Sequence, residues 1–180
     1  MKIKDIADIR SGVYLNTSPL GTVTYLQIKD LMPNSAQATA MVDYKPKMEN
    51  NLLKKGDVLF AGKGTTYLCT IFNQDIQAVA STTLYIIRLH SNVVSPEFLC
   101  WYLNRPQIAN EIKASQIGSS TPLILKSTLE NIEIPTPSKA KQTQMLEITK
   151  ILERETYLQK AIIEKRNQIV NQILINEINK

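Results

Sequence analysis

The chain has 180 residues, of which 43% are apolar, and a formal net charge of +5 with a sequence pI near 9.1. This length and composition predict a globular, soluble chain with one domain, or one domain and an appendage. No apolar run approaches the roughly 20 residues that cross a bilayer, and the charged start MKIKDIAD lacks a secretory signal, so we expect a cytoplasmic protein. The basic charge is compatible with a polyanionic partner but does not specify one.

Residue patterns in the chain before the IPTPS motif predict a body of mixed α and β structure. Short segments rich in β-branched and aromatic residues, bounded by turn signals, are expected to be strands: Thr22–Ile28, Asp57–Ala61, Tyr67–Phe72, Gln77–Ser81, Thr83–Leu89 and Ile132–Ile134. Ser95 is expected to cap a helix that begins at Pro96, and Pro106 to begin a second helix that ends at Gly118. The aromatic residues of the first helix are assigned to the core.

The cysteines and the histidine do not form a metal or catalytic pattern. Cys69 and Cys100 stand singly in apolar surroundings, without the close pairs or histidine partners that a zinc site uses, so we expect buried free thiols. His90 follows a strand-like run and is expected at a strand end. We therefore predict no metal and no cofactor.

A long helix is predicted after the motif IPTPS, which closes the body. Lys139 to Lys180 contain no Gly or Pro and are rich in Lys, Glu, Gln, Leu and Ile, and Thr136 is the expected cap with Pro137 in the first turn. Apolar residues recur close to heptad spacing, interrupted by charged residues, at Ile148, Ile151, Leu152, Leu158, Ile162, Ile169, Val170, Ile173 and Leu174. A helix of about 60 Å is longer than the body is wide, so another copy or another protein is expected to cover this stripe.

The loop GKGTT, from Gly62 to Thr66, carries donors that suit a phosphate. It is not a nucleotide-binding P-loop, because Gly56 lies one residue too far from Gly62 and Gly64 stands where the hydroxyl is needed. A dinucleotide fingerprint also fails, because its third glycine is replaced by Tyr67. Two interpretations remain open, namely a loop that approaches a nucleic-acid backbone and a tight β-turn with a solvated lysine.

A second loop, Gln116 to Pro135, has the same character. It begins with a small polar turn before Pro122 and continues through Lys126 into the last expected strand. Two such loops strengthen the interpretation of a polyanion-binding surface.

The order of the motifs KIKDIADIRSG, TYLQIKDL, LKKGDVLFAGKGT, VASTTLYIIRL, SPEFLCWYLN and IGSSTPLILKSTLENIEIPTPS, followed by a basic helix, resembles the specificity subunit of type I restriction-modification systems. The resemblance runs the length of the chain. It implies an α+β fold, with a mixed α/β target recognition domain over residues 1–136 and one conserved-region helix over residues 137–180. It also implies sequence-specific binding of double-stranded DNA without catalysis.

A full subunit of that family carries two recognition domains and two long helices that pack antiparallel, and each domain reads one half of a bipartite target. This chain has one of each, so it resembles a half subunit, and we expect a homodimer joined by an antiparallel coiled coil. The expected dimer interface consists of apolar residues of the stripe: Ile148, Ile151, Leu152, Leu158, Ile162, Ile169 and Ile173. By the same resemblance, the other partners are methyltransferase (modification) subunits and a restriction subunit.

The expected DNA contacts fall into three groups. Phosphate contacts are assigned to Lys63, Lys113 and Lys126. Hydroxyls and amides that set register are assigned to Thr65, Thr66, Ser119, Ser120 and Thr121. Base-edge contacts are assigned to Asn16, Gln27, Lys29, Lys45, Lys47, Thr82 and Thr83.

Two other classes of function are kept beside this one. One is a coiled-coil adaptor that binds a protein partner, and the steep salt dependence of DNA binding separates it from a DNA-recognition subunit. The other is a DNA-modifying or DNA-cutting enzyme. The sequence disfavours an enzyme, because it has no NPPY or DPPY tetrapeptide, and Glu111 and Lys113 fall on an expected helix without an acidic partner in register.

Overall fold

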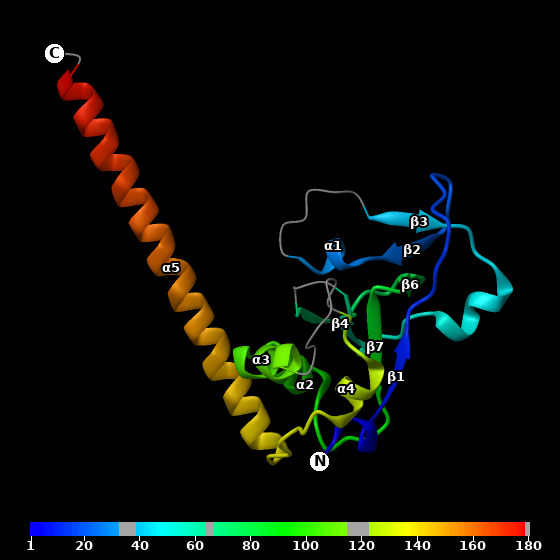
Figure 1. Cartoon of the computed structure of the whole chain (residues 1–180). Coiled ribbons are helices and arrows are strands. Elements are labelled where there is room, and N and C mark those ends of the chain that lie inside the picture. Colours follow the sequence, from blue (N-terminus) through cyan, green and yellow to red (C-terminus); the bar gives the residue numbers. More distant parts are fainter. Residues whose placement is uncertain (33–38, 64–66, 115–122, 179–180) are drawn as a thin grey trace. The chain divides into compact units, whose positions relative to one another are not determined.

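A computed structural model describes residues 1–32, 39–63, 67–114 and 123–178 (Figure 1). The chain divides into two compact units, Met1–Lys139 and Ala140–Lys180. The first unit is mixed α/β, and the second consists of the long helix α5, Lys139–Ile178. The predicted order, a mixed body followed by a long C-terminal helix, is thus confirmed.

The described strands of the first unit form two sheets. One sheet is antiparallel, with the order β1 (Ala7–Ser11), β7 (Leu84–Leu89), β4 (Val58–Ala61) and β5 (Cys69–Ile71). The other has the order β3 (Ala40–Val42), β2 (Val23–Leu26) and β6 (Ala78–Ala80). In this second sheet β2 runs antiparallel to β3 but parallel to β6.

Short helices connect and flank these sheets. They are the 3-10 helices η1 (Ile3–Asp5) and η2 (Pro46–Asn51) and the α-helices α1 (Ile28–Leu31), α2 (Pro96–Leu103), α3 (Pro106–Ala114) and α4 (Lys126–Asn131). The predicted cap of α2 is confirmed, because the Ser95 hydroxyl accepts the Phe98 N–H at 3.1 Å and Pro96 opens the helix. The predicted end of α3 at Gly118 lies outside the described residues.

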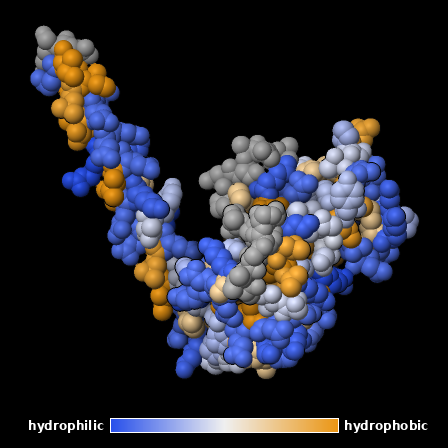
Figure 2. Space-filling model, in the orientation of Figure 1, coloured by the Kyte–Doolittle hydropathy of each residue, from blue (hydrophilic) through white to orange (hydrophobic). Residues whose placement is uncertain are grey.

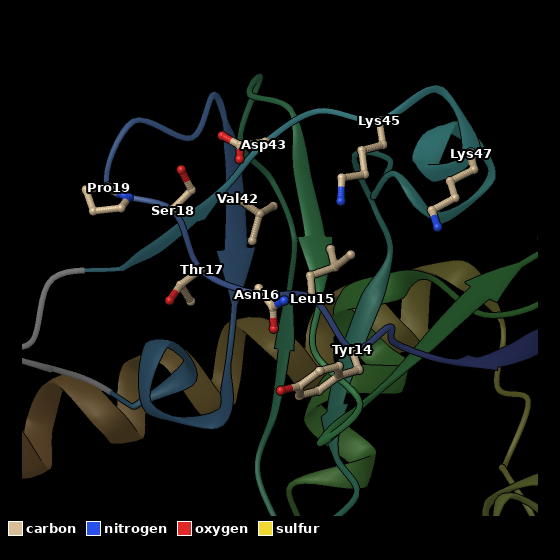
Figure 3. Close-up of a pocket in the computed structure, with 10 residues that line it drawn as sticks. All are labelled: Tyr14, Leu15, Asn16, Thr17, Ser18, Pro19, Val42, Asp43, Lys45 and Lys47. Atoms are coloured by element: carbon tan, nitrogen blue, oxygen red, sulfur yellow. The ribbon is translucent and has the colours of Figure 1, made fainter.

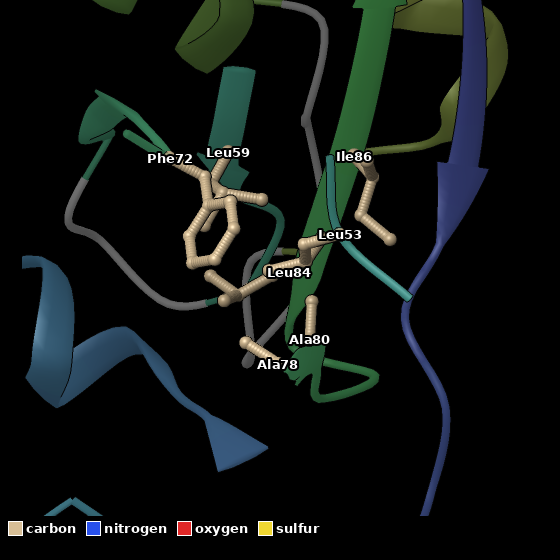
Figure 4. Packing of buried hydrophobic residues seen from close by; sticks show 7 residues of the cluster. All are labelled: Leu53, Leu59, Phe72, Ala78, Ala80, Leu84 and Ile86. Atoms are coloured by element: carbon tan, nitrogen blue, oxygen red, sulfur yellow. The ribbon is translucent and has the colours of Figure 1, made fainter. Parts of the chain in front are cut away.

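The core joins the two sheets. Side chains of β4 and β7 pack with those of β6 in one buried cluster: Leu53, Leu59, Phe72, Ala78, Ala80, Leu84 and Ile86 (Figure 4). A second cluster lies on the β2 sheet and contains Val23, Tyr25, Val42, Met48 and Val79. Because β6 contributes to both clusters, the two sheets are held in one hydrophobic unit.

Several sequence-based expectations are corrected. Ile28 begins helix α1 instead of ending a strand, and Ile132–Ile134 is not a strand. The latter segment pairs with the N-terminus through individual backbone bonds, from Ile3 N–H to Ile132 O at 3.1 Å and from Ile134 N–H to Met1 O at 2.7 Å. The long helix begins at Lys139, so Thr136 and Pro137 precede it.

Two aromatic residues of α2 and one of the two cysteines are less buried than the sequence predicts. Phe98 is buried, whereas Trp101 and Tyr102, which contact its ring, are half-buried. Cys69 is buried as expected, but Cys100 is only half-buried. Both thiols are free. Burial raises the pKa of Cys69, and the interaction between the two thiols raises it further and lowers the pKa of Cys100. Among the described helices, none is both long and apolar enough to span a membrane.

Candidate nucleic-acid interface

Two parallel strands bring predicted DNA-contacting residues to one edge of the β2 sheet. Leu26, the last residue of β2, pairs with Ala80, the last residue of β6. The Ser81 N–H donates to Leu26 O at 2.8 Å and extends this pairing by one residue. Because parallel strands end at the same edge, the residues that follow them are neighbours. Gln27 and Lys29 follow β2, and Thr82 and Thr83 follow β6, so all four come from segments that leave the sheet at this edge.

The same edge connects to the glycine-rich loop. The Gly62 N–H donates to Thr83 O at 2.8 Å, and the Ile124 N–H donates to Gly62 O at 3.0 Å. Lys63 forms an antiparallel bridge with Leu123 and has an exposed side chain. The two loops that the sequence analysis singled out thus meet at Gly62 and Lys63. Thr65, Thr66, Ser119, Ser120 and Thr121 lie outside the described residues.

The reason for glycine at position 62 is packing. A Cβ atom there would lie 2.6 Å from Cε2 of the Tyr85 ring, closer than side-chain atoms approach one another. The Tyr85 hydroxyl in turn donates to Ile124 O at 2.7 Å, which fixes the ring. The Gly62 N–H is already bonded to Thr83, so it is not available to a phosphate.

Two of the predicted phosphate-contacting lysines lie in different surroundings. Lys113, exposed on α3, places its ammonium 5.6 Å from the ring centre of Tyr67, the residue that follows the glycine-rich loop. Lys126 on α4 forms an ion pair with Glu130 at 3.3 Å. It lines a separate cleft with Lys4 of η1 and with Arg10 and other residues of β1. The described structure thus associates Lys113 with Tyr67, and Lys126 with β1.

A polar cleft of about 490 Å³ collects three residues that the sequence assigned to base reading, namely Asn16, Lys45 and Lys47 (Figure 3). Its other lining residues are Tyr14, Leu15, Thr17, Ser18, Pro19, Val42 and Asp43. The side chains offer ammonium, amide, hydroxyl and phenol groups, a set that suits base edges and phosphates.

One wall of this cleft is fixed by Tyr25. Its hydroxyl donates to Val13 O at 2.8 Å and accepts the Leu15 N–H at 3.4 Å. Burial raises the pKa of Tyr25, so the phenol stays protonated and keeps this donor. Tyr25 is thus a core residue. Tyr14, which lies in sequence between the two residues that the Tyr25 hydroxyl contacts, is 78% exposed.

Asp57 has a structural role in the first unit. It is 1% exposed and accepts two hydrogen bonds from Arg88, from Nε to Oδ1 at 2.6 Å and from a terminal guanidinium nitrogen to Oδ2 at 2.5 Å. Oδ2 also accepts the Lys54 N–H at 2.8 Å. The bonds to Asp57 raise the pKa of Arg88, so the pair remains charged. The sequence offered no sign of this pairing.

The predicted interface residues of α5 are all exposed in the single chain. Their exposed fractions lie between 43% and 66%: Ile148 58%, Ile151 66%, Leu152 55%, Leu158 43%, Ile162 57%, Ile169 61% and Ile173 56%. Figure 2 shows apolar residues spaced along this helix among hydrophilic ones. These exposed apolar side chains make this face of α5 a candidate surface for binding another protein.

Comparisons with known proteins agree on one family. The model of the type I restriction modification DNA specificity domain matches residues 1–168. The type I restriction enzyme MjaVIII specificity subunit of Methanocaldococcus jannaschii is 24% identical over 193 aligned residues, which cover 99% of this chain and 45% of that protein. The chain thus spans about half the length of that curated relative.

Solved structures share the fold. The HsdS subunit from Thermoanaerobacter tengcongensis matches with a TM-score of 0.64 and 16% identity, over 86% of this chain and 37% of that one. A chain from a structure on the complex assembly and conformational transition of the type I R-M system matches with a TM-score of 0.67 and 19% identity, over 92% of this chain and 40% of that one. Since the family model covers most of the sequence, this chain belongs to the type I restriction modification DNA specificity domain family.

Proposed function

We propose that this chain is a non-catalytic specificity subunit that binds double-stranded DNA in a type I restriction-modification complex. Residues 1–136 act as a target recognition domain that reads one half of a bipartite target. Residues 137–180 act as a helix that pairs with a second copy and also binds methyltransferase subunits, to which a restriction subunit is added. This assembly acts on DNA in the cytoplasm.

The observation that carries the DNA-binding role is the meeting of predicted contact residues from separate segments. Lys63, Thr83 and Gln27 come from three parts of the sequence, and backbone bonds through Gly62, Ser81 and Leu26 link these parts. Neighbouring side chains add ammonium, hydroxyl and amide groups, which supply phosphate contacts and base-edge contacts on one surface. The cleft around Asn16 and Lys47 adds further groups of the same kind.

DNA binding is tested by selection from a pool of random duplexes followed by sequencing of the bound fraction. We expect enrichment of an inverted repeat with a fixed gap, because two copies of one recognition domain read the same half-site in opposite orientations. Enrichment of a single undivided site would contradict the bipartite target. Affinity that does not change with ionic strength would contradict DNA binding through phosphates and favour a protein-binding adaptor.

The homodimer is tested by one pair of substitutions on α5. Ile162 and Tyr157 are 57% and 63% exposed in the single chain, so replacing either with Asp has a similar effect on an isolated helix. Only Ile162 lies in the apolar stripe. We expect Ile162→Asp to convert the dimer to a monomer, because burying an unpaired charge costs several kcal/mol, and Tyr157→Asp to remain dimeric. Light scattering measures both masses, and a dimeric Ile162→Asp chain overturns pairing through this stripe.

A further inference from the structure

We propose that α5 pairs with a second copy of this chain in one antiparallel register, in which Glu155 of one copy meets Arg166 of the other. This inference rests on the proposed homodimer and specifies its geometry. The seam residues recur in alternating steps of three and four, which is the spacing of coiled-coil core positions: Met145, Ile148, Leu152, Glu155, Gln159, Ile162, Arg166, Ile169, Ile173 and Asn176. All the charged and apolar members of this set are exposed in the single chain.

A parallel pairing is disfavoured by the two charged seam residues. In a parallel coiled coil each core residue meets its own counterpart, so Glu155 would face Glu155 and Arg166 would face Arg166. Like charges opposed in a partly desolvated seam cost free energy twice in each dimer. In an antiparallel pairing, the same two residues have opposite partners.

Only one antiparallel register joins these charges. With the two-fold axis between Lys160 and Ala161, the seam positions meet in matched layers: Ile148 with Ile173, Leu152 with Ile169, Glu155 with Arg166, and Gln159 with Ile162. The apolar residues then meet apolar residues, except that Ile162 packs beside the amide of Gln159 and Met145 beside the amide of Asn176. Each ion pair occurs twice, once on either side of the axis.

Shifted registers lose this match. A shift of one heptad in one direction places Glu155 opposite Ile173 and Arg166 opposite Ile162. A shift in the other direction places Glu155 opposite Gln159 and Arg166 opposite Ile148. Each alternative leaves both charges without a counter-ion in the seam. A charged layer of this kind contributes little net stability but selects the register.

The single helix already orients one partner of the pair. Gln159 Nε2 donates to Glu155 Oε1 at 3.2 Å, so the carboxylate lies along the seam, about one and a half turns from the axis. The register also fixes the span of the pair. Lys139 lies about 21 residues from the axis, so the two helix starts are about 65 Å apart along the pair at 1.5 Å per residue. This separation corresponds to nearly two turns of duplex at about 34 Å per turn.

Charge reversal is the first test. Glu155→Arg and Arg166→Glu each place like charges in the seam, so each is expected to raise the dimer dissociation constant at least about tenfold. The chain that carries both substitutions restores opposite charges and is expected to return to within about threefold of the original value. Glu153→Arg, a reversal off the seam, is the matched control. Sedimentation measures the constants, and circular dichroism shows whether helix content is unchanged.

Cross-linking is the second test and leaves the charges intact. A chain with Ile148→Cys is mixed with a chain of different size with Ile173→Cys, and the mixture is oxidised. We expect a disulfide between the two kinds of chain and none between like chains, with the unsubstituted chain as the control for Cys69 and Cys100. Links between like chains would overturn the antiparallel register.

The outcomes separate the register from the homodimer. A dimer that neither single reversal weakens, or that the double substitution fails to restore, overturns this register and leaves the proposed homodimer standing. An original chain that sediments as a monomer at every concentration overturns both.

Discussion

Arg88 on β7 and Asp57 at the start of β4 form a bidentate ion pair that closes one end of the antiparallel sheet. The ion pair lies next to the first residue pair of the two strands, because Val58, which follows Asp57, pairs with Ile87, which precedes Arg88. Asp57 also accepts the backbone N–H of Lys54 and so shapes the turn that leads into β4. A carboxylate held by three hydrogen bonds is a structural element of the fold that carries Gly62 and Lys63.

Asp57→Ala is expected to destabilise the first unit by about 3 kcal/mol, because it leaves the Arg88 guanidinium without its counter-ion. Urea unfolding followed by circular dichroism measures the loss. The exposed pair of Lys55 and Asp75, at 3.4 Å, supplies the control. Asp75→Ala should change stability by less than about 0.5 kcal/mol, since both side chains are largely solvated. Equal effects of the two substitutions would contradict the structural role of Asp57.

Gly62→Ala is expected to disrupt the junction of the two loops. The added Cβ would lie 2.6 Å from the Tyr85 ring, which is held by its bond to Ile124 O, so either the ring or the loop must move. We expect a loss of about 1–3 kcal/mol of stability, which is typical of overpacking. Tyr85→Leu in the same chain removes the clash, so the two substitutions should be less than additive. Strict additivity, measured by urea unfolding, would show that the ring does not require the glycine.

Local sequence patterns predict the inner strands well. Segments such as Leu84–Leu89 and Val58–Ala61 are rich in β-branched and aromatic residues and are bounded by turn signals, so their type and place follow from the sequence. Strand β1, Ala7–Ser11, is not among the expected strands, because it lacks the richness in β-branched and aromatic residues that marks the inner strands. Its buried Ala7 and Ile9 alternate with exposed Asp8, as in a half-buried edge strand. Ile132–Ile134 misleads for the opposite reason, since its isoleucines are buried without belonging to a strand.

For the candidate interface, the sequence predicts the types of contacting residue but not which of them meet in space. The residue types at Lys63, Thr83 and Gln27 can be selected from the sequence, because they are the groups that contact phosphates and bases. Their meeting depends on the parallel pairing of β2 with β6 and on the bond from Gly62 N–H to Thr83 O. These contacts join residues that are distant in sequence, and local propensity carries no information about them.

Lys63→Ala is expected to weaken binding to all DNA sequences alike and to lower the slope of log affinity against log salt by about one, because one phosphate contact is lost. Filter binding or fluorescence anisotropy across a salt series measures the slope. Lys55→Ala is the matched control, because Lys55 is exposed but paired with Asp75. An unchanged slope and an unchanged low-salt affinity for Lys63→Ala would remove this lysine from the interface.

Asn16→Ala is expected to alter sequence preference more than affinity. An amide that reads adenine contributes about 1–3 kcal/mol of discrimination, so its loss should relax the target at one position of each half-site. Lys63→Ala is the comparison, since loss of a lysine assigned to phosphate weakens binding to all sequences equally. Selection and sequencing with each variant measures the preference. A uniform loss for Asn16→Ala would assign this residue to the backbone instead of a base.

Alkaline pH should act on the loop junction through Tyr85. Burial raises the pKa of Tyr85 above its ordinary value of 10.0, and the protonated hydroxyl donates to Ile124 O. Because the folded state holds this proton more tightly than the unfolded state, the stabilisation is complete below the unfolded pKa and is lost as the pH rises through the folded pKa. The original chain should therefore be more stable than Tyr85→Phe by about 1 kcal/mol at neutral pH.

This difference is expected to shrink between about pH 9 and pH 12, as the phenol of the original chain ionises. Urea unfolding of both chains across this range measures it, and subtraction removes the effects of lysines and thiols that the chains share. Tyr14→Phe, at a side chain that is 78% exposed, is the control for loss of a solvated hydroxyl. A difference between the original chain and Tyr85→Phe that stays constant or grows with pH would contradict a buried, protonated phenol that joins β7 to Ile124.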